Sequence, residues 1–257
     1  MISKIKYPLS IIKYKIWKFK FEEKTDLNIS NKEKEIVKKM RKDGFYIIEN
    51  FIDLETCKKI ISLIDETIVK FPEKIKEDDL KSDQRILRSE NLSPEINNYF
   101  NNNFIQNIGE YYSGMKIKIG FTMANKVEFV EKNLGSGGGW HKDAYYSQFK
   151  SILYLNNTSI ENGSFQFLEK SNKLVSSMII SLKLNKGYPN TRFTNEEIKL
   201  LKDYKIKNIA APAGTLILVD SSLIHRGSPL LKGNRYALTN YYFPINSFEN
   251  QMIRFNN

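Results

Sequence analysis

The sequence predicts a mainly β domain, a sandwich or a barrel, with helices at its N-terminal side. Seven short runs of strand-favouring residues follow one another after residue 114, and Gly, Asn, Pro and Ser separate them. Hydrophobic residues make up 41% and charged residues 27% of the 257 residues, so the chain can bury a sizeable core within one domain.

The N-terminal part predicts two helices and one strand. Ser30 or Asn31 can cap a short helix over residues 31–42, and the run FYIIE at 45–49 favours a strand. Asp53 can cap a longer helix that ends near Phe71, because its apolar residues recur at helical spacing. Residues 72–110 are mixed and polar and predict no regular element.

The β region is predicted from seven runs and contains one helix. Thr194 and Glu197 form a capping box that opens a helix over residues 195–204. The expected strands lie at 115–122, 127–131, 151–155, 164–168, 175–182, 215–220 and 235–243. No repeat of 20–50 residues is present, which excludes a solenoid or propeller.

The basic charge is concentrated at the N-terminus. The formal net charge is +11, and the first 42 residues contain thirteen basic and five acidic residues. Apolar and Lys residues interleave over 1–21, which favours two interpretations. This segment either lies on an anionic membrane surface or acidic partner, or it packs on the body as a basic strand or helix. We therefore expect a basic arm over 1–30 and a main domain over 31–257.

Other compositional features exclude several classes of protein. No run of 18 apolar residues is present, so no transmembrane segment is expected. Lys outnumbers Arg 33 to 7, which we read as a compositional bias, so no nucleic-acid binding is expected. The single Cys57 excludes an intrachain disulfide and Cys-based zinc or iron–sulfur sites, and a cytoplasmic location is expected.

Both histidines of the chain lie in motifs that suggest a metal site. In a strand, residues two apart share one face, so His141 and Asp143 would present an imidazole and a carboxylate side by side. His225 follows another apolar strand, and a small barrel can bring it opposite the first pair. Two His and one carboxylate are the ligand set of non-haem Fe(II) oxygenases. Arg235 opens the next strand and is a natural anchor for a carboxylate.

Five motifs in order resemble the phytanoyl-CoA dioxygenase family over roughly residues 35–245. They are Asp43-Gly-Phe-Tyr-Ile-Ile-Glu-Asn-Phe51, His141-Lys-Asp143, Ile160-Glu-Asn-Gly163-Ser-Phe-Gln-Phe-Leu168, Ala213-Gly-Thr-Leu-Ile-Leu-Val-Asp220 and His225-Arg-Gly-Ser-Pro229 with Arg235-Tyr-Ala-Leu. The resemblance implies a double-stranded β-helix, which is a cupin-like jelly roll, with flanking helices. It also implies a dioxygenase that hydroxylates a small organic metabolite, and the basic charge hints at an anionic substrate.

The resemblance further implies the cofactors and their ligands. Fe(II) would be held by His141, Asp143 and His225, and 2-oxoglutarate would chelate the iron with its far carboxylate on Arg235. O2 is then the third reactant. Family members often carry Ser two positions after the second His, where this chain has Gly227, so Ser228 is the expected co-substrate contact. The alternative function is a catalytically inactive jelly roll that binds a glycan, a lipid or an anionic surface.

Three further features have open interpretations. Asn125 can point into the cavity from a strand. Residues 135–139, Gly-Ser-Gly-Gly-Gly, favour a flexible rim or lid beside the pocket over a plain hairpin loop. Arg85 and Arg88 either lie on the solvated surface or hold an anionic substrate or the co-substrate.

Overall fold

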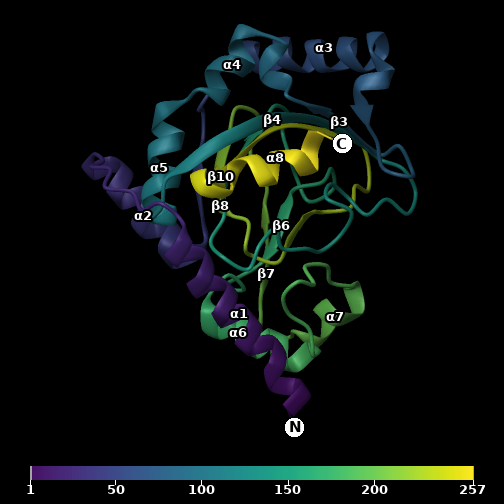
Figure 1. The fold of residues 1–257 in the computed structure, drawn as a ribbon. Coiled ribbons are helices and arrows are strands. Elements are labelled where there is room, and N and C mark those ends of the chain that lie inside the picture. The colour runs from purple at the N-terminus through teal and green to yellow at the C-terminus, as the bar shows by residue number, and fades with distance from the viewer. Residues whose placement is uncertain (1, 257) are drawn as a thin grey trace.

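The structure is a computed structural model that describes residues 2–256, with side chains described for 6–16, 18 and 20–253. Two β-sheets face each other, and helices surround them (Figure 1). The helices are α1 (Ile2–Phe21), α2 (Asn31–Asp43), α3 (Leu54–Lys70), α4 (Pro94–Phe100), α5 (Asn103–Ser113), α6 (Leu174–Leu184), α7 (Asn195–Leu200) and α8 (Phe248–Asn256). The strands are β1 (Phe45–Ile48), β2 (Ile75–Lys76), β3 (Asp83–Leu87), β4 (Ile117–Glu128), β5 (Phe149–Tyr154), β6 (Phe165–Leu168), β7 (Ile206–Ile209), β8 (Leu216–Asp220), β9 (His225–Gly227) and β10 (Asn234–Pro244).

Both sheets are antiparallel and together form a double-stranded β-helix with flanking helices. The large sheet has the order β1-β8-β5-β10-β4-β3-β2, and the small sheet has the order β7-β6-β9. Strands β1 to β5 all lie in the large sheet, and the later strands are shared between the two sheets, so β10 comes to lie between β4 and β5. This jelly-roll architecture confirms the expected fold class.

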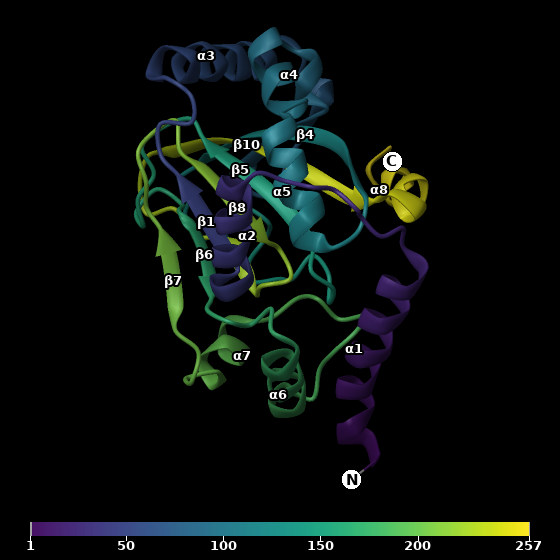
Figure 2. The same cartoon turned by 90° about the vertical axis from the view of Figure 1, so that its left-hand side faces the viewer.

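The apolar core has two layers because the large sheet buries both of its faces. Its outer face packs against α2, α3, α4 and α5, through residues such as Met40, Ile64 and Ile105 (Figure 2). Its inner face packs against the small sheet, through residues such as Ile217 and Phe167. The helices therefore support the sheet from outside and leave its inner face to form a site.

The predicted helix caps are present. Ser30 caps α2 in a capping box with Glu33, and Asp53 caps α3, which ends before Phe71. Thr194 and Glu197 form the second capping box, although α7 ends at Leu200 rather than near residue 204. Local hydrogen bonds fix where these helices begin, so the sequence was sufficient to place them.

The strand predicted over 175–182 is wrong, because this segment is helix α6. Its buried face consists of Ser177, Ile180 and Ser181, at helical spacing. Since two of these three residues are serines, the run showed no apolar helical period. Helix α1 packs beside α6.

Two other expectations in the β region are corrected. The runs at 115–122 and 127–131 are parts of one long strand, β4, which pairs with β10 along its length. The polar stretch 72–110 contains β2, β3, α4 and α5. Its strand β3 turns Asp83 and Arg85 toward the inside of the barrel as an ion pair, so no apolar alternation marked it.

The basic N-terminal segment is a helix that packs on the body. Ile11 is fully buried, and Lys18 is buried with its ammonium on Glu22 at 2.5 Å and Ser247 at 2.6 Å. The ring of Tyr14 stacks on Tyr188 with 4.2 Å between ring centroids. Among the residues that the structure describes, no helix is both long and apolar enough to cross a membrane.

Candidate active site

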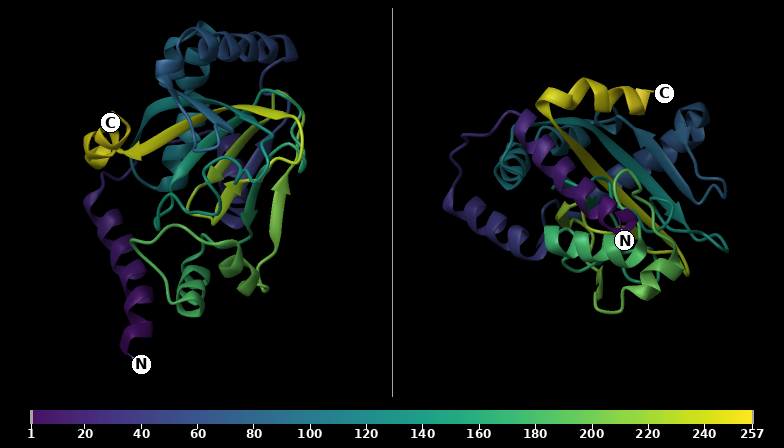
Figure 3. Two further views of the ribbon diagram at one scale, coloured as in Figure 1. Left: turned by 90° about the vertical axis from the view of Figure 1, so that its right-hand side faces the viewer. Right: turned by 60° about the horizontal axis from the view of Figure 1, so that its bottom comes forward.

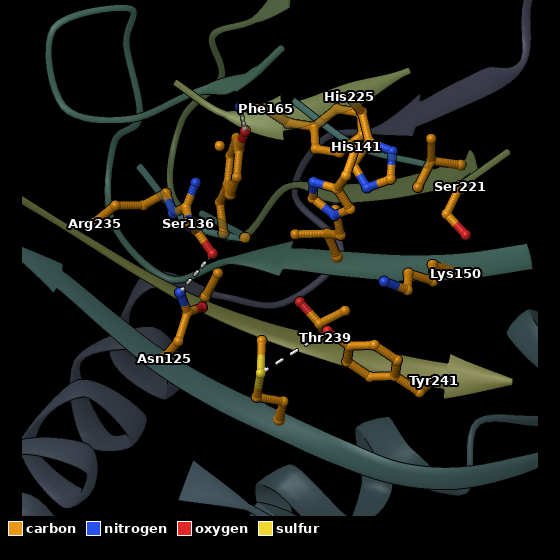
Figure 4. Close-up of a pocket in the computed structure, with 17 residues that line it drawn as sticks. Asn125, Ser136, His141, Lys150, Phe165, Ser221, His225, Arg235, Thr239 and Tyr241 are labelled. Atoms are coloured by element: carbon orange, nitrogen blue, oxygen red, sulfur yellow. Dashed lines mark hydrogen bonds between the residues drawn. The ribbon is translucent and has the colours of Figure 1, made fainter. Parts of the chain in front are cut away.

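The two histidines lie side by side because their backbones pair. His141 N donates to His225 O at 2.8 Å, and His225 N donates to His141 O at the same distance. The two ring centroids are 4.3 Å apart, and both rings point into a pocket on the inner face of the large sheet (Figure 4). His225 comes from β9, whereas His141 lies in a short extended segment outside the named strands.

Hydrogen bonds to the backbone fix the orientation of both rings. Nδ1 of His141 is 2.9 Å from the carbonyl of Gly139, and Nδ1 of His225 is 2.9 Å from the carbonyl of Leu223. A carbonyl oxygen can only accept a hydrogen bond, so Nδ1 carries the proton as donor and each Nε2 keeps its lone pair for a metal. Burial lowers the pKa of His141 and lowers that of His225 to about 3. Both imidazoles are therefore neutral at neutral pH, as metal ligands must be.

Asp143 supplies a carboxylate to the same point. Its Oδ1 is 3.6 Å from His141 Nε2, and its Oδ2 is 4.0 Å from His225 Nε2. Burial would raise the pKa of Asp143, but the neighbouring Lys150 cation outweighs burial and holds that pKa well below its ordinary value. The carboxylate is thus ionised, and one donor atom from each of the three residues lies within 4.8 Å of the others.

This donor set fits a divalent transition metal. Two imidazole nitrogens and one carboxylate oxygen are borderline-hard ligands that suit iron, and three protein ligands leave coordination positions for reactants. The predicted triad of His141, Asp143 and His225 is therefore brought together. Gly137 lies against the first ring, since a Cβ on this glycine would be 2.5 Å from Cε1 of His141.

Arg235 lies at one end of the pocket and is a buried cation. Its Nη1 donates to the carbonyl of Gly163, whereas its buried Nε has no hydrogen-bond partner in the described structure. No carboxylate among the described residues lies within 4 Å of the guanidinium. A buried charge without an ionic partner is costly, so this end of the pocket suits an anionic ligand.

The wall beside Arg235 is polar. Asn125 lines the pocket from the middle of β4, and its amide donates to Asp83 at 3.2 Å and to Ser136 at 3.4 Å. Ser136 and Gly137 also line the pocket, so the glycine-rich segment forms part of its wall. Gly135 fits there because a Cβ would lie 2.1 Å from the carbonyl oxygen of Gly227.

The structure places the three other candidate residues, Ser228, Arg85 and Arg88, in different surroundings. Gly227, the last residue of β9, lines the pocket, and Ser228, which follows the strand, does not. Arg85 lies on β3 opposite Asn125 and bonds Asp83, with a third of its side chain exposed. Arg88 is exposed.

Lys150 is the site residue that the sequence analysis missed. It lies on β5 and lines the pocket, with Nζ 2.5 Å from Asp143 Oδ2 and 4.1 Å from the ring centre of Tyr241. Lys150 shares a strand face with Ile152 and Tyr154, so one lysine on the inward face of an apolar strand was the available signal. Figure 4 places Lys150 and Arg235 at opposite ends of the pocket, with the imidazoles between them.

Comparisons with solved structures show that other proteins share this fold. The chain is similar to the epimerase SnoN in complex with Fe3+, alpha ketoglutarate and nogalamycin RO, at 13% identity and a TM-score of 0.63 over 82% of this chain and 83% of that chain. It is also similar to EctD from S. alaskensis with bound Fe, at 15% identity and 0.61 over 88% and 81%. HygX from Streptomyces hygroscopicus with nickel and 2-oxoglutarate bound has 13% identity and 0.56 over 85% and 88%.

Sequence comparison gives the family. No curated protein sequence matches the chain significantly. The family model described as phytanoyl-CoA dioxygenase matches residues 40–231, a span that includes all three residues of the triad. This match covers most of the chain, and the fold and the buried donor set agree with it. The chain therefore belongs to the phytanoyl-CoA dioxygenase family.

Proposed function

We propose that this protein is an Fe(II)- and 2-oxoglutarate-dependent oxygenase that hydroxylates a small organic acid. The observation that carries the proposal is the convergence of His141, Asp143 and His225 in a pocket that also buries Arg235. Bound iron and 2-oxoglutarate would supply an oxidation by O2 of an unactivated C–H bond, with succinate and CO2 as products.

The protein's own residues prepare this site in three ways. Nε2 of each imidazole and one oxygen of Asp143 would hold the metal, and the backbone carbonyls behind the rings keep the rings oriented. Arg235 would bind the far carboxylate of 2-oxoglutarate by charge-assisted hydrogen bonds, and Asn125 lies on the wall beside it. Phe165 and Gly227 of the small sheet and Ser136 and Gly137 of the 135–139 segment form part of the pocket wall.

The position and charge of Lys150 support the proposal that the substrate is an acid. The paired strands place Lys150 opposite Tyr241, six positions from Arg235, so the two cations lie at separate ends of the pocket. With the metal ion and doubly charged 2-oxoglutarate in place, the two cationic side chains and Asp143 leave the pocket with one net positive charge. A carboxylate on the substrate would neutralise this charge beside Lys150.

The test is oxygen-dependent succinate formation by the purified protein with Fe(II) and 2-oxoglutarate. A panel of small carboxylic acids and their primary amides serves as substrates, because each pair differs by one charge at nearly constant shape. We expect acids to stimulate succinate formation more than their amides, and His141→Ala and His225→Ala to abolish it. Asp203→Ala is the control, since this carboxylate is exposed far from the pocket.

The outcomes separate the parts of the proposal. Succinate formation that persists in His141→Ala would contradict the oxygenase function. Stimulation by the amides alone would contradict the acidic substrate and leave the oxygenase function intact. Binding of panel compounds with no succinate formation in the wild type would favour the inactive binding module instead.

A further inference from the structure

The exposed face of α1 alternates between lysines and aliphatic residues. Among the described side chains of α1, those at positions 6, 9, 13, 16 and 20 are exposed along one side of the helix, and Phe21 at its end is also exposed but lies off this side. Leu9 and Ile16 are 48% and 62% exposed, and Lys6, Lys13 and Lys20 lie between and beyond them. None of these three lysines forms an ion pair with any residue that the structure describes.

The opposite face of α1 uses its lysines differently. Lys18 is buried between Glu22 and Ser247, and Lys15 donates to the carbonyl of Asn172 at 3.4 Å. These contacts, with the stacking of Tyr14 on Tyr188, hold the helix against the body. The outward lysines are therefore presented on a fixed surface.

Helix α6 has an outward face that is almost wholly aliphatic. Val175, Ile179 and Leu182 recur at helical spacing and are 68%, 50% and 45% exposed. The helix contains no acidic residue and one lysine, Lys183, which pairs with Asp203. A helix face that exposes several aliphatic side chains at helical spacing is normally covered by another surface.

The exposed faces of α1 and α6 lie at the same end of the molecule. Helices α1 and α6 lie side by side in Figure 1 and in the right-hand view of Figure 3, and they contact each other directly. The end with α3 and α4 lies on the other side of the sheets (Figure 1).

We infer that the α1–α6 surface, defined by Lys6, Leu9, Lys13, Ile16 and Lys20 of α1 and by Val175, Ile179 and Leu182 of α6, binds the interface of an anionic phospholipid membrane. The lysines complement lipid phosphates, and the aliphatic side chains reach the boundary of the acyl chains.

Two features favour lipid over a protein. The exposed apolar residues of this surface are aliphatic, whereas the centres of protein interfaces are enriched in aromatic residues and Arg. A second copy of the chain is disfavoured, because each copy carries a net charge of +11 and the lysines of α1 border the surface.

The test is sedimentation of the full-length protein with vesicles. One set contains phosphatidylcholine alone, and the other contains equal parts of phosphatidylcholine and phosphatidylglycerol, each at low and high salt. We expect the protein to sediment with the anionic vesicles at low salt and to stay in solution with the neutral ones. High salt should weaken binding because it screens the lysines.

Substitutions in the α1–α6 surface, each with a control elsewhere, test whether this surface makes the contact with lipid. Lys13→Gln with Lys20→Gln should weaken binding by about fivefold per lysine. Val175→Ser with Ile179→Ser should weaken it by roughly tenfold. Their controls are Lys58→Gln and Val69→Ser, which change exposed residues of α3 at the opposite end of the molecule. Circular dichroism verifies that each variant is folded.

Several results would overturn the inference. Equal sedimentation with both kinds of vesicle, or no sedimentation with either, would exclude recognition of anionic lipid. Equal losses in the α3 controls would show that net charge, and not this surface, drives binding. A dimer in light scattering that Val175→Ser with Ile179→Ser dissociates, without any lipid binding, would assign the surface to contact between two copies.

Discussion

His141 and His225 are 84 positions apart in the chain and exchange two backbone hydrogen bonds of 2.8 Å. This pairing fixes the spacing of the two imidazoles before any metal binds, because it is made by main-chain atoms. The carbonyls of Gly139 and Leu223 then set the orientation of each ring. Only Asp143 has a side chain held by another charged side chain, Lys150.

Removal of a triad ligand should abolish stabilisation by a metal. In the wild type, nickel(II) at a hundredfold excess over its Kd should add about 2.7 kcal/mol to the free energy of unfolding, because it binds only the folded site. Asp143→Ala and His225→Ala should lose this gain, and Asp203→Ala should keep it. Thermal unfolding with and without nickel measures the difference, and an undiminished gain in Asp143→Ala would contradict the assigned ligands.

Arg235→Met should weaken 2-oxoglutarate binding and leave metal binding unchanged. A charge-assisted hydrogen bond contributes about 1.5–3 kcal/mol, so the Kd for 2-oxoglutarate should rise by roughly 10- to 100-fold. Calorimetry measures the nickel affinity on the metal-free protein and the 2-oxoglutarate affinity on the nickel-loaded protein, with Arg192→Met as the control because that side chain bonds Gly137 and Gly138 and not Gly163. An unchanged Kd would remove Arg235 from the proposed binding site.

Lys150→Met should destabilise the protein in a way that a metal reverses. In the metal-free protein the variant leaves the buried Asp143 carboxylate without its cation, and loss of one partner of a buried pair costs about 3–5 kcal/mol. A bound divalent ion restores the missing positive charge, so the loss should be much smaller with nickel. Thermal unfolding in both states measures this, and an equal loss in both would mean that Lys150 acts only through packing.

Gly137→Ala should lower metal affinity, whereas Gly233→Ala should not. Both glycines have positive φ, at +87° and +66°, so both variants have backbone strain on the order of 1–3 kcal/mol. Only Gly137 lies against the ring of His141, where a methyl group would displace the imidazole; a Cβ at Gly233 has nothing within 4 Å. Equal nickel affinities in the two variants would show that the ring tolerates the displacement.

The capping box of α2 should make stability depend on pH. Burial opposes ionisation of Glu33, but hydrogen bonds from the side chain and backbone of Ser30 outweigh it and lower the pKa of Glu33. Because the pKa of Glu33 is lower in the folded than in the unfolded protein, ionised Glu33 stabilises the fold at pH values above its ordinary pKa of 4.5. This stabilisation is lost as the pH falls through the folded-state pKa. Ser30→Ala should cost about 1 kcal/mol at pH 7 and less at pH 3, measured by urea unfolding. An equal loss of stability at both pH values would contradict the conclusion that Ser30 lowers the pKa of Glu33.

The sequence by itself determined the features that depend on neighbours in the chain. Ser30 and Asp53 placed the beginnings of α2 and α3, because a cap bonds the amides two or three residues further on. Short motifs around His141 and His225 indicated the metal ligands, and their resemblance to one family indicated the fold. These features can be recognised from the sequence because each depends on a few consecutive residues.

The tertiary structure decided what depends on distant contacts. Helix α6 has serines on its buried face, so only the packing of α1 beside it shows that the segment is helical and not extended. Lys150 enters the site because β5 pairs with β10 and turns this side chain toward Asp143. Strand β9 carries both His225 and Gly227 into the pocket and ends before Ser228, which does not line it. Strand register and helix packing are set by the whole core, and no single stretch of sequence specifies them.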